Sequence, residues 1–205
     1  MTASGPRSPR LRVIGPPPGA PEAIPGAGLL AMKLFVAALG MLFVTSLIGY
    51  VAVRARAPQW PPPGMPPLPD GLWFSTFVLI GCSGAIHLAL RAIRRDQRGA
   101  AARWLALTFA LGVVFLVSQT VGWFGLVERA MTPKSNLYAF TFFLLTGLHA
   151  AHVLGGLIPL GIVTWRTFAQ RYDAKSHGGI EYQAVYWHFL DGVWVILFVV
   201  LLIGS

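Results

Sequence analysis

The sequence Leu145-Thr-Gly-Leu-His-Ala-Ala-His-Val-Leu-Gly155 places two histidines, His149 and His152, three residues apart in a long apolar stretch. No residue between Lys134 and Arg166 carries a formal charge. A stretch of this length and composition predicts a helix that spans a membrane. Because ionisable side chains at membrane depth are energetically costly, they usually face protein partners and mark function. The two histidines are therefore the first candidates for a functional site.

The composition of the whole chain also indicates a membrane protein. Of its 205 residues, 55% are hydrophobic and 11% are charged, whereas soluble domains average about 25% charged residues. Four further stretches are long and almost free of charge, with Asp191 as the one exception. We therefore expect an all-α fold, a polytopic transmembrane bundle of five helices at about 31–53, 71–92, 104–127, 137–165 and 182–204.

The chain divides into an N-terminal segment and a membrane domain. Residues 1–30 are rich in Pro and Gly without periodicity, which predicts disorder. Residues 31–205 form the expected five-helix domain. The linker Pro58–Pro69 contains seven prolines, so we expect an extended segment that is hydrogen-bonded only to water. Cys82 is the only cysteine, and we expect it to be a packing residue.

Basic residues are distributed unevenly between the two sides of the expected bundle. Four of the 16 Lys and Arg residues, Arg54, Arg56, Arg129 and Lys134, lie in the loops of one side, and the others lie on the opposite side. Cytoplasmic loops are the richer in Lys and Arg. The N-terminus is therefore expected in the cytoplasm and the C-terminus outside. The arginine cluster is interpreted as a topology signal, with no nucleic acid as a partner.

Polar residues in two of the expected helices are candidates for a common core. His149 and His152 share a helix face, and so do His188 and Asp191, because residues three apart are neighbours on a helix. We expect the two faces to meet, with Asp191 paired to a histidine or to Trp or backbone donors, since an unpaired buried carboxylate is costly. The remaining candidates for this polar core, or for lipid or subunit contacts, are Gln119, Trp187 and Trp194.

Three interpretations of the histidines remain open from the residues alone. The first is internal hydrogen bonding that fixes helix packing or contacts a lipid. The second is haem ligation, in which His87 and His149 clamp a b-type haem. The third is a proton relay through Asp191 and the histidines. No thiolate or carboxylate cluster predicts a metal site.

Several motifs resemble subunit III of the haem–copper oxidases. Residues 138–156 are similar to that family's Thr-Gly-x-His-x-x-His-Val-x-x-Gly signature, and residues 186–194 to its Tyr-Trp-His-Phe-x-Asp-x-x-Trp segment. Residues 112–119 resemble its Gly-x-x-Phe-x-x-x-Gln pattern, and Thr76, Ser83 and His87 fit more loosely. The resemblance covers about residues 34–203 and is closest to the short, five-helix form, such as cytochrome c oxidase subunit III.

The resemblance implies a non-catalytic subunit of a proton-pumping respiratory terminal oxidase, stabilising subunit I in a bacterial inner membrane. It implies contacts with subunit I, subunit II and other respiratory subunits, bound phospholipid, and haem and copper in the partner subunits only. A subunit III-like protein of a quinol oxidase or nitric oxide reductase, or a small b-type membrane cytochrome, is the alternative. Two family glutamates are replaced, by Leu47 and Gly122, which argues against a proton-collecting role within this subunit.

Overall fold

The computed structural model describes residues 26–204, and this part of the chain folds into five α-helices. They are α1 (Ala27–Arg56), α2 (Gly71–Arg94), α3 (Arg98–Glu128), α4 (Leu137–Phe168) and α5 (Gly178–Ile203). Each is long and apolar enough to cross a membrane. The predicted all-α transmembrane fold is thereby confirmed. Residues 1–25 of the predicted disordered segment lie outside the described residues, and α1 begins before the predicted residue 31.

Most helices extend beyond the ranges expected from the apolar stretches. α3 begins at Arg98 rather than near residue 104, and α5 begins at Gly178 rather than at 182. The charge-free stretch marks only the part of a helix that lies in hydrocarbon. Long basic side chains reach the polar interface, so the helix continues through the first charged residues.

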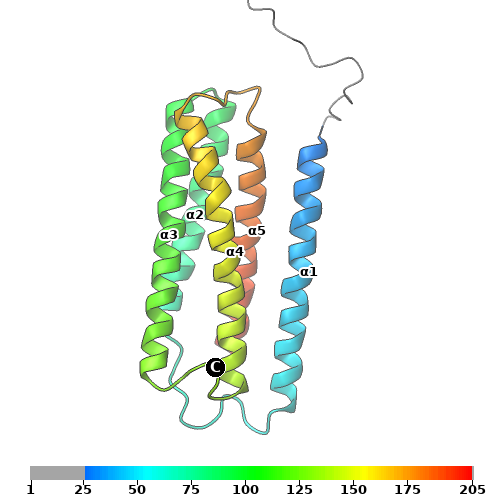
Figure 1. The fold of residues 1–205 in the computed structure, drawn as a ribbon, viewed down its shortest axis with the longest axis vertical. Coiled ribbons are helices and arrows are strands. Elements are labelled where there is room, and N and C mark those ends of the chain that lie inside the picture. The colour runs from blue at the N-terminus through cyan, green and yellow to red at the C-terminus, as the bar shows by residue number, and fades with distance from the viewer. Residues whose placement is uncertain (1–25, 205) are drawn as a thin grey trace, which may run out of the picture.

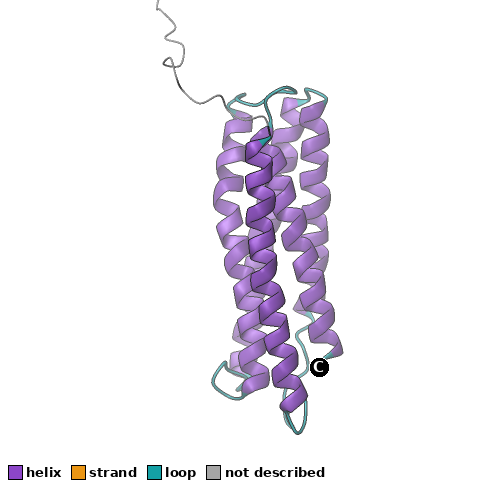
Figure 2. Cartoon of the chain, turned by 90° about the vertical axis from the view of Figure 1, so that its right-hand side faces the viewer, coloured by secondary structure: helices purple, strands orange, loops and turns teal. Residues whose placement is uncertain are grey.

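Four of the helices form a closed ring, and the fifth lies against its side. α2 packs on α3, α3 on α4, α4 on α5, and α5 on α2. α1 contacts only α5 and α4, and it stands apart from the ring over much of its length (Figure 1). Within α1, only Phe43 and Tyr50 are buried. All helices run roughly along one long axis, with the loops at its two ends (Figure 2).

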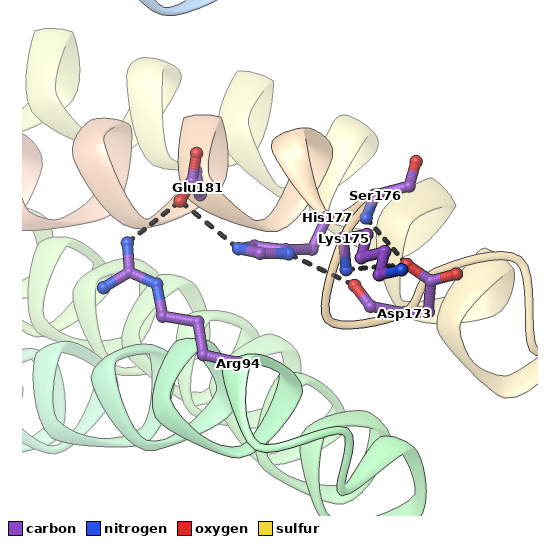
Figure 3. Close-up of polar contacts among 6 residues, drawn as sticks. All are labelled: Arg94, Asp173, Lys175, Ser176, His177 and Glu181. Carbon is purple, nitrogen blue, oxygen red and sulfur yellow. Dashed lines mark hydrogen bonds and ion pairs between the residues drawn. The ribbon is translucent and has the colours of Figure 1, made fainter.

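The basic residues gather at one end of this bundle. The α2–α3 and α4–α5 loops lie at the end where α1 begins (Figure 1). There Arg94 of α2 forms a 2.9 Å ion pair with Glu181 of α5, and His177 lies 3.4 Å from the same carboxylate oxygen (Figure 3). Asp173 accepts hydrogen bonds from the backbone N–H groups of Ser176 and Lys175, and these hold the pKa of its carboxyl below the ordinary value.

The proline-rich linker packs against the opposite end of the bundle. Trp60 lies between Tyr50 of α1 and Tyr138 of α4, with ring centroids 5.6 and 5.2 Å away. The Asn136 amide donates to the sulfur of Met65 at 3.2 Å. The expectation of a linker that is hydrogen-bonded only to water was therefore wrong. Aromatic rings next to the prolines give it apolar surface, which it buries on the helices.

Two tryptophans of α5 fill the centre of the four-helix ring. Trp187 and Trp194 are almost completely buried. Trp187 lies against Gly112 of α3, where an added Cβ would come within 2.8 Å of its ring. Trp194 packs edge-on against Phe115 of α3 at 4.9 Å between centroids. α3 and α5 lie on opposite sides of the four-helix ring. Large aromatic side chains are therefore needed to fill the distance between them.

This packing predicts the effect of adding one methyl group at residue 112. Gly112→Ala should destabilise the isolated chain by about 1–3 kcal/mol, because the buried Trp187 ring has no room to withdraw. Gly122→Ala is the matched control on the same helix, since no atom lies within 4 Å of the added Cβ. Thermal unfolding in detergent, followed by loss of helical circular dichroism, measures both. Equal stability of the two variants would contradict the packing argument.

Candidate functional site

His149 is enclosed by aromatic rings at the centre of the bundle. It has no exposed surface, and its ring lies 4.9 Å from Trp194, 5.6 Å from Phe115 and 6.2 Å from Phe43, measured between centroids. Among residues 26–204, neither of its ring nitrogens has a hydrogen-bond partner. The side chain therefore packs as an aromatic ring, contacting α1, α3 and α5 from its position on α4.

His152 lies one turn away in a different environment. Its Nδ1 is 2.7 Å from the backbone carbonyl of Leu148, and its ring is 5.2 Å from that of Phe43. The Tyr186 hydroxyl donates to the backbone carbonyl of His152 at 2.9 Å. His152 borders a groove of about 450 Å³ between α1 and α4–α5, whose lining is mainly apolar and includes Phe35, Leu39, Gly155, Pro159 and Gln183.

His188 and Asp191 face α2 rather than α4. Nδ1 of His188 lies 2.7 Å from the hydroxyl oxygen of Ser83, and its ring centroid lies 6.2 Å from that of His87. Both histidines are exposed on the surface of the described chain. Asp191 is buried, and neither of its carboxylate oxygens has a hydrogen-bond partner among the described residues.

Other polar side chains form hydrogen bonds across the seams of the ring. Gln119 of α3 donates to the Ser75 hydroxyl of α2 at 2.8 Å, and Ser118 lies 3.0 Å from the same oxygen. Trp194 donates to Thr76 of α2 at 3.0 Å, and Trp123 of α3 donates to Thr146 of α4 at 3.2 Å. The indole N–H of Trp187 has no partner within the described residues.

The expected single polar core is therefore divided into separate places. His149 meets α5 through Trp194, but Asp191 is not paired with a histidine or a tryptophan in the described chain, which corrects that expectation. Residue spacing predicted which side chains share a face of one helix. It did not predict how each helix is rotated against its neighbours. The hydroxyl partners Ser75, Ser118 and Thr146 were missed; their only signal is their place inside otherwise apolar stretches.

The haem-clamp and proton-relay interpretations find little support in this geometry. His87 lies at the outer surface of α2 beside His188, whereas His149 is enclosed on α4, and α2 and α4 are not in contact. Within residues 26–204, no three His, Cys, Asp or Glu side chains gather as they would around a metal ion. Cys82 is buried, as expected, with its thiol 3.7 Å from the carbonyl of Thr108.

A comparison with protein families matches nearly all of the described chain. A family described as cytochrome c oxidase subunit III matches residues 27–205. The chain belongs to this family. Cytochrome c oxidase subunit 3 of Synechocystis sp. is 35% identical over 85% of this chain and 75% of the relative. The protein of the same name from Thermostichus vulcanus is 31% identical over 87% and 88%, respectively.

A longer relative shows how this subunit III compares in size. Cytochrome c oxidase subunit 3 of Marchantia polymorpha is 36% identical over 82% of this chain but over only 62% of its own length. Membership of the subunit III family implies assembly in a membrane with other oxidase subunits. The family resemblance found in the sequence motifs is thereby confirmed, and the oxidase class of the chain follows from it.

The two kinds of buried polar group in this subunit III predict opposite mutational effects. Gln119→Leu should destabilise the isolated chain by about 1 kcal/mol, because it removes a hydrogen bond to Ser75. His149→Leu should leave stability unchanged or raise it, because an apolar side chain of similar volume replaces an imidazole without hydrogen bonds. Unfolding temperatures in the same detergent test both. Strong destabilisation by His149→Leu would mean that the imidazole has a polar partner.

Proposed function

We propose that this chain is a non-catalytic, stabilising subunit of a proton-pumping respiratory oxidase that transfers electrons from cytochrome c to oxygen. It lies beside subunit I, which together with subunit II carries the haem and copper. The observation that supports this most directly is the family match over residues 27–205. The seam hydrogen bonds and aromatic core of the ring support a structural role, because they fix helix positions with no arrangement of groups for chemistry.

The proposed location is a bacterial inner membrane, with the N-terminus in the cytoplasm and the C-terminus outside. The five apolar helices support a multi-pass membrane protein. The arginine-rich loops lie at the end of the bundle where α1 begins, which supports that end as the cytoplasmic one under the positive-inside rule.

We also propose that the groove between α1 and α4–α5 holds a phospholipid chain. Its walls are mainly apolar, and the side chains of His152 and Gln183 border it. The Oε1 atom of Gln183 is buried without a hydrogen-bond partner in the described chain. A lipid chain fills such a groove by apolar contact with Phe35 and Leu39.

The proposed role in the complex predicts what copurifies with the chain. A tagged chain extracted from native membranes in mild detergent should bring down a large oxidase subunit and its haem- or copper-bearing partner, identified by mass spectrometry. Oxygen uptake by that complex should be supported by reduced cytochrome c. A complex purified from cells lacking the chain should begin with normal turnover and lose activity sooner. Recovery of the chain alone with a b-type haem spectrum would instead indicate a membrane cytochrome.

The lipid proposal has its own test in the same complex. Gly155→Leu fills the groove, and its Cβ meets no other atom of the chain within 4 Å. The purified complex with this variant should retain less phospholipid than wild type, measured by native mass spectrometry or lipid extraction. Gly125→Leu on α3 is the control, because it is equally open but away from the groove. Unchanged lipid content in Gly155→Leu would overturn the assignment of this groove.

A further inference from the structure

The surface where α2 and α5 meet carries the two exposed imidazoles of the membrane span. His87 and His188 lie side by side there, with ring centroids 6.2 Å apart. Nδ1 of His188 is held by the Ser83 hydroxyl at 2.7 Å, so the outer side of that ring is left to face its surroundings. Neither nitrogen of His87 has a hydrogen-bond partner among residues 26–204.

The two histidines lie well inside the ends of their helices. His87 is seven residues from Arg94 at the end of α2, or about 10 Å along the helix, and His188 is ten residues from Gly178, or about 15 Å. The headgroup layer accounts for only about 5–8 Å on each side of the bilayer. At this depth, acyl chains offer no hydrogen bonds, so imidazoles exposed to them are costly.

Other polar side chains on the outer surface of the bundle do not share this problem. The hydroxyls of Thr45, Ser46 and Thr120 each donate to a backbone carbonyl one turn earlier in the same helix. They are satisfied within the chain and are compatible with lipid. The His87–His188 pair differs because both rings are exposed and the one hydrogen bond found for the pair is that between Nδ1 of His188 and Ser83.

A second observation lies directly behind the pair. Asp191 is one turn from His188, its side chain is 7% exposed, and both carboxylate oxygens lack a hydrogen-bond partner among the described residues. It lies within interaction range of Ser83, the same residue that holds His188. Asp191 therefore adds a third ionisable side chain to this part of the membrane span, close to the exposed pair.

Two glycines make this surface flat enough for another helix to approach. Gly84 and Gly192 are exposed on α2 and α5, and an added Cβ at either would meet no atom of the chain within 4 Å. Internal packing therefore does not require glycine at these positions. Both glycines lie within one turn of an exposed histidine, Gly84 of His87 and Gly192 of His188. Small residues next to polar ones are typical of helix–helix interfaces in membranes.

We propose that the α2–α5 surface formed by Ser83, Gly84, His87, His188 and Gly192 is the docking site for a transmembrane helix of another oxidase subunit. That helix presents a hydrogen-bond donor side chain at the depth of His87 and His188. The donor complements the exposed imidazole nitrogens, and the glycines allow the two backbones to approach closely. This inference rests on the proposed role as an oxidase subunit and assigns that role a specific surface.

The steric test uses the open space at Gly84. A Cβ added at Gly84 meets no atom of the chain within 4 Å, so Gly84→Leu should fold as wild type does, with an unchanged unfolding temperature when isolated. Its retention in the complex, measured as the ratio of this chain to the large subunit after purification, should fall about tenfold, corresponding to about 1.4 kcal/mol of association free energy. Gly125→Leu on α3 is the matched control and should be retained as wild type. Full retention of Gly84→Leu would overturn the proposed surface.

Photo-crosslinking identifies what occupies the surface. A photoreactive amino acid at residue 87, irradiated in native membranes, should form a product with another oxidase subunit, identified by mass spectrometry. A product with lipid only, or with a second copy of this chain only, would overturn the proposal. Copurification of the wild-type chain with the oxidase distinguishes a failure of the proposed function from a failure of the proposed docking surface. Loss of that copurification contradicts the proposed function, whereas its presence together with retained Gly84→Leu contradicts the docking surface alone.

Discussion

The bundle depends on the contact between the indole of Trp187 and the bare backbone at Gly112. α3 and α5 face one another across a ring of four helices, in which the backbones of neighbours lie close together and opposite members meet only through large side chains. The interior must therefore be filled by large side chains that span it. Trp187, Trp194 and Phe115 do this, and glycine at residue 112 provides the space for the largest of them. The hydrogen bonds between helices lie at the seams around this aromatic core.

The polar groups fall into three environments that correspond to different physical demands. Gln119, Trp194 and Trp123 each donate across a seam between two neighbouring helices, which fixes the rotation of those helices. His149 lies among aromatic rings without hydrogen bonds in the described chain. His87 and His188 lie at the surface. The hydrogen bonds that join helices are thus concentrated at the seams, whereas groups without a partner in the described chain occur both in the interior, at His149, and near the α2–α5 surface, at Asp191.

The sequence predicted the number and type of helices because bilayer thickness and charge leave few alternatives. It predicted their ends less well, since α3 continues to Arg98 through residues that reach the interface. Residue spacing placed His149 with His152, and His188 with Asp191, on common faces. Spacing along one helix contains no information on how that helix is rotated against others, so the pairing expected for Asp191 was wrong. The side chains that fix this rotation, such as Ser75 and Thr146, are common in membrane helices and carry no distinctive motif.

The weak attachment of α1 bears on how the chain is made. Arg54 near the end of α1 donates to the backbone carbonyl of Ile203, 149 residues later, and the buried Phe43 contacts Phe189 of α5. Synthesis proceeds from the N-terminus, so α1 is made before its partners on α4 and α5. It must remain a single helix in lipid during that interval. Only two of its side chains are buried in the finished bundle, so α1 loses few contacts while it stands alone in lipid, and it can complete its packing after α4 and α5 are in the membrane.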